Sequence, residues 1–275
     1  MAPGLTVLHA SDLQCGKPFL PEAADALLRV AHAVSPDLVV VAGDLTQRAK
    51  VREYETARCV LDRFGELPVV VTPGNHDVPL YRVWERLGQP FRNWRNFTGR
   101  DELDTVTRVH GATVVALSSA APLRAVVNGR LHPSQVDFAR HAFADAAHDD
   151  LRILVVHHHF APVPTAEGGD PLPGAAGLAD SFREMGVDVV LGGHVHQLHL
   201  RIFRGLPFLS TGTATSRRGR GVEAGWNSFC VHRFAAGHVE VTPYRRAPHA
   251  ADFEPMDTVG FELGARGAGE GSVAR

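Results

Sequence analysis

The stretch PVVVTPGNHD, residues 68–77, decides how this chain folds. Its first part is a short β-branched apolar run of the length expected for a buried strand. The turn after it carries Asn75, His76 and Asp77. An asparagine carbonyl can ligate a hard cation, a histidine can act as ligand or general acid, and an aspartate can hold that histidine in one orientation. Ordinary turn chemistry also explains this turn, so its meaning depends on the rest of the chain.

Upstream of this stretch, apolar runs alternate with helical patterns. Residues 5–10 and 37–42 predict strands, and the second is apolar throughout, as in a strand covered on both faces. Amphipathic patterns predict helices over residues 21–34 and 51–64, with Pro21 suited to a first helical turn. The βαβαβ order predicts a parallel sheet with right-handed crossovers.

Downstream, the pattern changes from helices and buried strands to antiparallel strands. Residues 80–104 predict helix and loop, either over the site or packed as a surface helix. A hairpin around Gly111, a helix from Pro133, two buried strands and a helix ending at Met185 follow. The remaining strands are expected at 198–203, 206–210, 228–234 and 239–244. We expect one domain over residues 1–248 and a disordered tail over 249–275.

Composition bounds the class of protein. With 275 residues, 44% of them apolar, the chain can bury a full core. A net charge of −2 and a pI near 6.8 give no broad electrostatic attraction to nucleic acid or an anionic membrane. Three scattered cysteines form neither a disulfide framework nor a CxxC metal site. No leader and no membrane-spanning run is evident, so we expect a cytoplasmic protein without membrane or nucleic-acid partners.

Polar side chains follow five of the predicted strands at the point where each ends. The clusters are Asp12 and Gln14; Asp44; Asn75, His76 and Asp77; His157 and His158; and His194 and His196. Ligands of α/β sheets lie at the carboxyl ends of strands, where loops converge. Carboxylates, imidazoles and amide oxygens together suit Mn, Fe or Zn, and they are too many for one tetrahedral ion. They suit two ions roughly 3.5–4 Å apart that share a carboxylate, as in phosphoryl transfer.

The same residues carry a family resemblance. SDLQ (11–14), GDLTQR (43–48), GNHD (74–77), HHHF (157–160) and GHVH (193–196), in this order, resemble the five motifs of the calcineurin-like metallophosphoesterase superfamily. The closest likeness is to its bacterial branch near the class III cyclic-nucleotide phosphodiesterases. The resemblance covers roughly residues 5–245. It implies a four-layer α/β/β/α sandwich, with two mixed sheets flanked by helices and a metal pair at one edge.

The resemblance also implies roles for single residues. The first ion would be held by Asp12, Gln14, Asp44 and His196. The second would be held by Asp44, Asn75, His157 and His194, so that Asp44 bridges the two. His76 would stabilise the transition state or protonate the leaving oxygen, and Asp77 would orient it. A hydroxide between the metals would be the nucleophile, because coordination lowers the pKa of water to about 7.

Two motifs depart from the common pattern. Gln14 stands where the family usually has histidine, and a neutral amide is a weaker ligand, so the first site is expected to bind more loosely or to prefer Mn or Fe. HHHF replaces the commoner His-His-Pro, which leaves His158 as the fallback for His157. Substrate contacts are expected from Arg48 and from Arg217 and Arg218 in the basic loop 216–220, although a solvated loop explains the latter equally well.

The sequence therefore predicts a dinuclear metal-dependent phosphoesterase, more specifically a phosphodiesterase acting on a cyclic nucleotide or a similar small diester. A phosphomonoesterase and a nucleotide or lipid pyrophosphatase are the alternatives within hydrolases. A metal-binding interaction module that has lost turnover is the alternative from another class, favoured only by Gln14. The cofactors would be two divalent ions, and a homodimer is left open.

Overall fold

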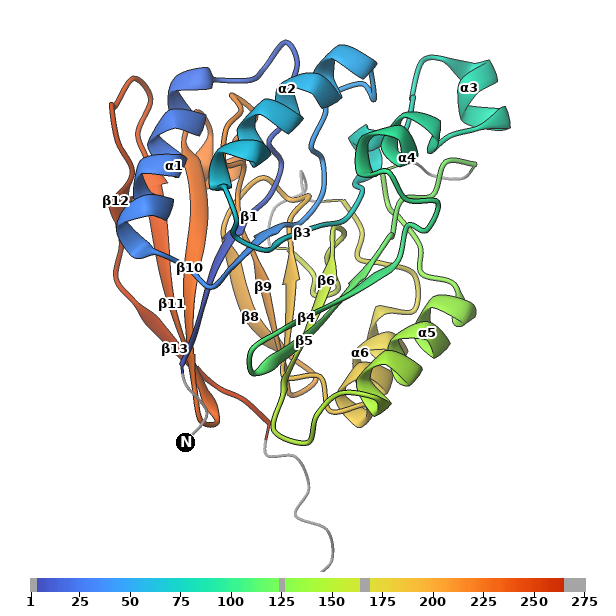
Figure 1. Ribbon diagram of the computed structural model, residues 1–275, viewed down its shortest axis with the longest axis vertical. Helices are drawn as coiled ribbons and strands as arrows, with labels where there is room; N and C mark the ends of the chain where they lie inside the picture. The colour runs from blue at the N-terminus through green and yellow to red at the C-terminus, as the bar shows by residue number, and fades with distance from the viewer. Residues whose placement is uncertain (1–3, 124–126, 164–168, 265–275) are drawn as a thin grey trace, which may run out of the picture.

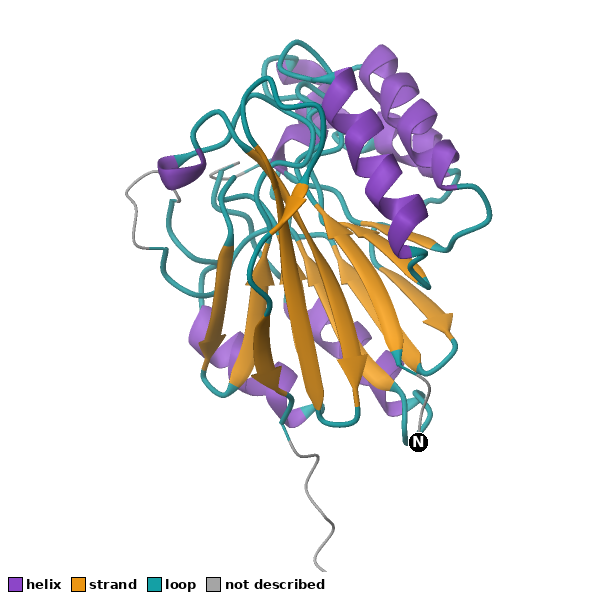
Figure 2. Cartoon of the chain, turned by 90° about the vertical axis from the view of Figure 1, so that its left-hand side faces the viewer, coloured by secondary structure: helices purple, strands orange, loops and turns teal. Residues whose placement is uncertain are grey.

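Two mixed β-sheets pack face to face, with helices on their outer faces (Figures 1 and 2). A computed structural model describes residues 4–123, 127–163 and 169–264. Its helices are α1 (Pro21–Val34), α2 (Val51–Leu61), α3 (Val83–Gly88), α4 (Arg92–Thr98), α5 (Pro133–Ala144) and α6 (Ala175–Glu184). None of the helices in these ranges has the length and apolarity needed to cross a membrane.

The first sheet has the order β12-β11-β10-β1-β2-β3, and β13 also pairs with β11. Its strands β1, β2 and β3 are parallel, as the βαβαβ order predicted, and β10 runs antiparallel to β1. Its members are β1 (Leu5–Ala10), β2 (Leu38–Val41), β3 (Val69–Val71), β10 (Asn227–Ala235), β11 (His238–Arg246), β12 (Glu254–Pro255) and β13 (Val259–Glu262).

The second sheet has the order β4-β5-β6-β7-β9-β8. The predicted hairpin is its antiparallel pair β4/β5, and β5, β6, β7 and β9 are parallel to one another. Its members are β4 (Thr105–Val109), β5 (Ala112–Leu117), β6 (Leu151–Val156), β7 (Val189–Gly192), β8 (His199–Phe203) and β9 (Leu206–Ser210). The expected sandwich of two mixed sheets flanked by helices is confirmed.

The core explains why the central strands are apolar throughout. Val7 of β1 contributes to the apolar layer between the sheets, whereas its neighbour Leu8 packs in the layer under α1 and α2. Successive side chains of a strand point to opposite faces, so a strand covered on both faces needs apolar residues at every position. On the outer face of the second sheet, Phe143 of α5 and Phe182 of α6 are fully buried.

The C-terminal segment corrects one expectation. Residues 249–264 do not form a tail, because β12 and β13 both pair with β11. Phe253 and Phe261 are buried in the process. These strands are too short to show a clear alternating pattern, and their pairing covers backbone groups that an edge strand would otherwise leave open. The rest of the expected tail, residues 265–275, lies outside the described part of the chain.

Two buried histidines lie side by side in the first sheet. Nδ1 of His9 on β1 is 3.1 Å from Nε2 of His232 on β10, and both side chains are fully buried. Burial lowers the pKa of His9 to about 3 and the pKa of His232 well below its usual value. Both imidazoles are therefore neutral in the folded protein, whereas the unfolded chain protonates them near pH 6.5.

This pair predicts acid sensitivity. Because the unfolded state binds more protons below pH 6.5, the free energy of unfolding should fall as the pH falls, by about 2 kcal/mol per histidine at pH 5. Urea unfolding at pH 7.5 and pH 5 measures it. Replacing His9 and His232 together by leucine should flatten this dependence, whereas His110→Leu at an exposed site should not. An unchanged dependence in the double variant would contradict the assignment.

Candidate active site

The five polar clusters converge at one edge of the sandwich. They follow the carboxyl ends of β1, β2, β3, β6 and β7, which run parallel within their own sheets. The buried members are Asp12, Gln14, Asp44, Asn75, Asp77, His157, His158, His194 and His196. A row of carboxylates, amides and imidazoles held away from water is costly unless the groups satisfy one another or bind a ligand. All of the expected ligands are thus brought to one place.

The backbone at this edge is strained. Five of the clustered residues have a left-handed conformation, with φ between 51° and 73°: Asp12, Gln14, Asp44, His194 and His196. This region is uncommon for residues other than glycine, although aspartate and histidine enter it more often than most. Strain of this kind persists where the surrounding structure enforces it and is concentrated at functional sites. This conformation turns the backbone sharply after each of these strands.

The second expected ligand set is compact. The Asn75 Oδ1 atom lies 3.0 Å from His194 Nδ1 and 3.3 Å from His157 Nε2. His157 Nε2 is 3.5 Å from Asp44 Oδ1. Ligand atoms about 2.1 Å from a shared ion lie roughly 3.0 Å apart at octahedral angles and roughly 3.4 Å apart at tetrahedral angles. These three contacts have the spacing of ligands around one ion. Among the described residues, the carboxylate and imidazole groups whose ligand atoms all lie within 4.8 Å of one another are His157, His158 and His194, and Asp12, Asp44 and His157.

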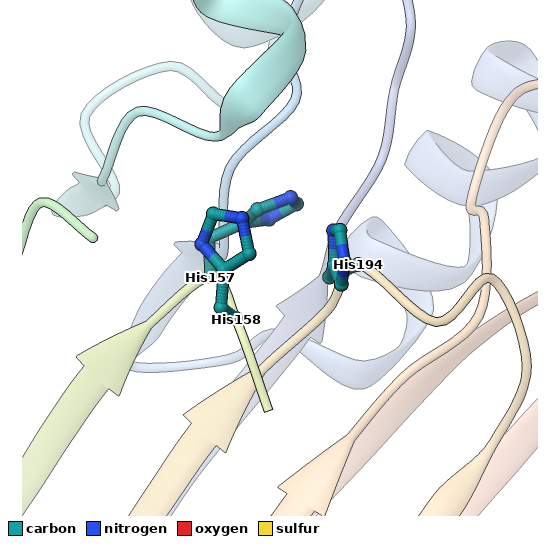
Figure 3. Close-up of side chains that lie close together, drawn as sticks. All are labelled: His157, His158 and His194. Atoms are coloured by element: carbon teal, nitrogen blue, oxygen red, sulfur yellow. The ribbon is translucent and has the colours of Figure 1, made fainter. Parts of the chain in front are cut away.

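His157 contacts this set directly, and His158 lies next to it. Its Nδ1 donates to the carbonyl of Ala42 at 2.7 Å, which directs Nε2 toward Asp44. Burial lowers the pKa of His157, but the Asp44 and Asp12 carboxylates and the Ala42 carbonyl together raise that pKa to about 9. Surroundings that hold a proton on an imidazole also favour a cation there. His158 Nδ1 contacts the Ser119 hydroxyl at 2.7 Å, whereas its buried Nε2 has no hydrogen-bond partner, so the choice of His157 over His158 stays a prediction. Figure 3 shows His157, His158 and His194 gathered together, and their ligand atoms lie within 4.8 Å of one another.

Two members of the first expected set, Asp12 and His196, are in direct contact. Asp12 Oδ2 accepts hydrogen bonds from Ser11 Oγ and from the backbone N–H of His194. The other oxygen, Oδ1, is fully buried and lies 3.0 Å from His196 Nε2. His196 Nδ1 donates to the carbonyl of Arg218, so in the neutral ring Nε2 is an acceptor as well. Two acceptors this close need a proton or a cation between them, and Asp44 lies beside both sets.

The fourth member, Gln14, faces this set with its nitrogen. Its Nε2 donates to Asp44 Oδ2 at 3.0 Å and lies 3.4 Å from His196 Nε2. Its Oε1 points the other way and accepts from Arg218 Nη1 at 2.8 Å. Metal ligation by Gln14 stays a prediction, because an amide binds a cation through its oxygen.

His76 lies at the mouth of the site and is partly exposed. Its backbone N–H donates to Asp44 Oδ1, and its Nδ1 donates to the carbonyl of Gln47 at 2.9 Å. Its Nε2 is then free to accept from Arg218 Nη1, 2.9 Å away. Burial lowers the pKa of His76, with the Asp44 carboxylate opposing and the Arg218 charge adding to the effect. The ring is therefore neutral and held from both sides.

Asp77 does not orient His76 as expected. The carboxylate accepts hydrogen bonds from the backbone N–H groups of Leu45, Thr46 and Gly74 and from the Thr46 hydroxyl. Burial and the nearby Asp44 carboxylate raise the pKa of Asp77 to about 7, against the lowering effect of these bonds. Asp77 thus ties the loop after β2 to the loop after β3, and the backbone carbonyl of Gln47 orients His76.

The three arginines proposed for substrate contact lie in different surroundings. Arg218 reaches into the site, whereas Arg217 donates to the carbonyl of Lys17 and is exposed. The guanidinium of Arg48 lies over the ring of Tyr81, 4.3 Å from its centroid.

A cavity of about 390 Å³ opens over the site and is lined by Asp44, Gln47, Arg48, Asn75, His76, Leu80, Tyr81, Val127, His194, His196, Arg218 and Arg220. Of the helical region over residues 80–104, Leu80 and Tyr81 reach this cavity, while Trp94 and Phe97 of α4 pack against α2.

The loop between β9 and β10 is a structural element of the site that the sequence did not predict. It pins the loop after β1, because Thr213 Oγ1 donates to the carbonyl of Asp12 and Thr215 Oγ1 donates to the carbonyl of Leu13. The signal was the hydroxyl-rich run STGTATS, residues 210–216, which lies between two strands and directly precedes the basic loop.

Comparison with known proteins agrees with this geometry. The calcineurin-like phosphoesterase family model matches residues 5–198. A probable cyclic nucleotide phosphodiesterase of Synechococcus is 31% identical over 204 residues, which cover 70% of this chain and 71% of that protein. A protein of the same description from Rhodococcus erythropolis is 27% identical over 237 residues, covering 80% and 74%.

A solved structure extends the likeness to the fold. The purple acid phosphatase PPD1 of yellow lupin superposes with a TM-score of 0.72 at 13% identity. The match covers 95% of this chain and 54% of that protein, so this chain spans about half of its length. With the family model matching well over half of the sequence, this chain belongs to the calcineurin-like phosphoesterase family and is a phosphoric ester hydrolase.

Proposed function

We propose that this protein is a dinuclear metal-dependent phosphodiesterase that hydrolyses small diesters such as cyclic nucleotides. The observation that carries the proposal is the pair of adjoining ligand sets that share Asp44. One set comprises Asp12, Asp44 and His196, and the other comprises Asp44, Asn75, His157 and His194. Mixed oxygen and nitrogen ligands suit divalent Mn, Fe or Zn. When bound, such ions would supply water of lowered pKa and neutralise charge on the phosphoryl group.

The chain's own residues then bind and orient the substrate. Arg218 and His76 face the cavity beside Asp44, and the Arg218 guanidinium can donate to phosphoryl oxygens. In hydrolysis a P–O bond to water forms as the P–O bond to the leaving group breaks, and the leaving oxygen gains a proton. His76 Nε2 faces Arg218 at the cavity, and once the ring has taken up a proton there it is the atom placed to deliver that proton to the leaving oxygen or to stabilise its charge.

Two observations support a diester with an organic group. Tyr81 lines the cavity and is 69% exposed, so the face of its ring that Arg48 leaves uncovered is available to an organic group. Two of the bacterial relatives carry the description of probable cyclic nucleotide phosphodiesterases. The charge of the cavity favours a dianionic monoester instead, because Arg48, Arg218 and Arg220 all line it.

The experiment that decides between these substrates compares bis-p-nitrophenyl phosphate with p-nitrophenyl phosphate. The protein is stripped of metal and refilled with Mn²⁺, and stripped protein serves as the control. A higher kcat/KM for the diester is the expected result. A preference for the monoester would replace the proposal with a phosphomonoesterase. Inactivity of the refilled protein on both esters and on cyclic nucleotides would overturn the enzymatic proposal in favour of a metal-binding module.

His76→Ala should separate chemistry from metal binding. Only the imidazole is lost, because the contact with Asp44 comes from the backbone N–H of His76. We expect kcat on the diester to fall by roughly 10²-fold, as for loss of a proton-transfer group, with metal content unchanged. Metal analysis and steady-state kinetics on the same preparation measure both. His110→Ala, at an exposed histidine, is the control. Full turnover in His76→Ala would remove His76 from the mechanism.

A further inference from the structure

The orientation of the Gln14 amide is fixed from both ends. Its carbonyl oxygen accepts from Arg218 Nη1 at 2.8 Å, and its nitrogen donates to Asp44 Oδ2 at 3.0 Å. Asparagine and glutamine orientations are assigned from their hydrogen-bond networks, and here a guanidinium that only donates and a carboxylate that accepts agree on the same assignment. The opposite orientation would place the amide N–H groups against the guanidinium and the amide oxygen against the carboxylate.

Arg218 is itself firmly placed. Its backbone carbonyl accepts from His196 Nδ1 at 2.7 Å, and its backbone N–H donates to Ser216 Oγ. The Ser216 carbonyl in turn accepts from Asn227 Nδ2 at 2.8 Å, at the start of β10. A partner that orients a metal-binding histidine is constrained to one position by that role. The backbone of Arg218 is therefore fixed beside His196, which keeps the guanidinium charge close to the site.

We infer that Gln14 is not a metal ligand but a link between Arg218 and Asp44, and that the two metal positions consequently fill in sequence. The inference rests on the proposed metal centre. The second position has four protein ligands, and we assign it the tightly held ion. The first position keeps Asp12, Asp44 and His196, and it lies within one amide of a fixed positive charge. One ligand fewer and a nearby like charge both weaken binding of a cation there.

The inference also assigns Arg218 a positioning role. Gln14 can turn its oxygen toward the first ion only if the guanidinium moves away, because both hydrogen bonds of the amide are then lost. An anionic phosphoryl group in the cavity would offer Arg218 a better acceptor than a neutral amide. Occupancy of the first position is thereby coupled to the Arg218 contact.

The test measures metal binding rather than turnover. Metal-free protein is titrated with Mn²⁺ by calorimetry, and metal retained after gel filtration is counted by mass spectrometry. We expect one Mn²⁺ per chain to be retained and a second to bind at least roughly tenfold more weakly, the scale on which contacts around a site alter metal affinity. Two ions of equal affinity in the wild-type protein would overturn the inference.

Three variants identify the cause. Arg218→Met removes the charge and the hydrogen bonds to Gln14 and His76. It should strengthen binding of the second Mn²⁺, the weakly held ion at the first position, by roughly tenfold. Arg217→Met, the matched control at the exposed neighbour, should leave it unchanged. Gln14→Leu should also leave the weak event within about threefold of wild type, because no ligand is lost. Loss of that event in Gln14→Leu would show that Gln14 ligates the ion. No gain in Arg218→Met with a native circular dichroism spectrum would show that the Arg218 charge does not weaken the first position, and either result overturns the inference.

These outcomes are independent of the substrate. Sequential filling in a protein that hydrolyses no phosphoester would leave the inference standing and remove the proposed function. Diester hydrolysis by a protein that binds two equal ions would do the reverse.

Discussion

Asp44→Asn should abolish phosphodiester hydrolysis and weaken both metal positions at once. Asp44 is fully buried and contributes one oxygen near His157 and the other near Gln14 and the first set. Asparagine keeps the shape of the side chain and accepts the His76 backbone N–H, but it lacks the charge that both ions share. Loss of one stabilising group at a transition state costs about 10²–10³-fold in kcat, so we expect at least roughly a 10³-fold fall.

Metal analysis after gel filtration and kinetics on bis-p-nitrophenyl phosphate measure this prediction together. Asp257→Asn, at an exposed aspartate, is the matched control and should keep both metal content and rate. If Asp44→Asn retained wild-type metal binding and full rate, Asp44 would not bridge the two positions.

Asp77→Ala should cause the largest loss of stability at this edge. Its carboxylate satisfies three backbone N–H groups and one hydroxyl from two separate loops. The three N–H groups lose this acceptor in the variant, whereas the Thr46 hydroxyl also contacts the carbonyl of His76. Each buried donor without a partner costs about 1–3 kcal/mol, and non-additivity reduces the sum. We expect the free energy of unfolding of the metal-free protein to fall by about 3–5 kcal/mol, comparable to removing one partner of a buried charged pair.

Urea denaturation at pH 7.5 gives this value directly. Asp257→Ala, which removes an exposed carboxylate, should change the free energy of unfolding by less than about 0.5 kcal/mol. A loss below about 1 kcal/mol in Asp77→Ala would mean that the two loops are held together by other contacts.

The sequence was most informative where apolar runs end abruptly in polar residues. The runs before Asp12, Asp44 and Asn75 are strands β1, β2 and β3, and their parallel pairing brings the three ends together. Parallel strands buried on both faces leave a strong signal, since nearly every position is apolar. The parallel sheet and the gathering of the polar residues were therefore predictable from local patterns, whereas the sandwich of two mixed sheets was implied by the family resemblance.

Contacts between distant segments were not predictable in the same way. Asp77 was assigned to its neighbour His76, but its partners come from a loop some 30 residues earlier. The local sequence does not indicate whether Arg217 or Arg218 points into the site. That depends on the hydroxyl-rich run before them, which is hydrogen-bonded to the distant loop after β1. The strands β12 and β13 were missed for the same reason, since their stability comes from pairing with β11.

The left-handed backbone at five of the clustered residues limits how this centre can be dissected by mutagenesis. An alanine placed at Asp12, Asp44 or His196 loses a ligand and also occupies a conformation that costs roughly 1–2 kcal/mol for an ordinary residue. Alanine scanning here would measure backbone relaxation and metal loss as a single number. At the two aspartates, asparagine tolerates that conformation and keeps the shape of the side chain, so it is the replacement that reports on the lost charge alone. The same constraint narrows the residues that evolution can try at these positions without reshaping the loops.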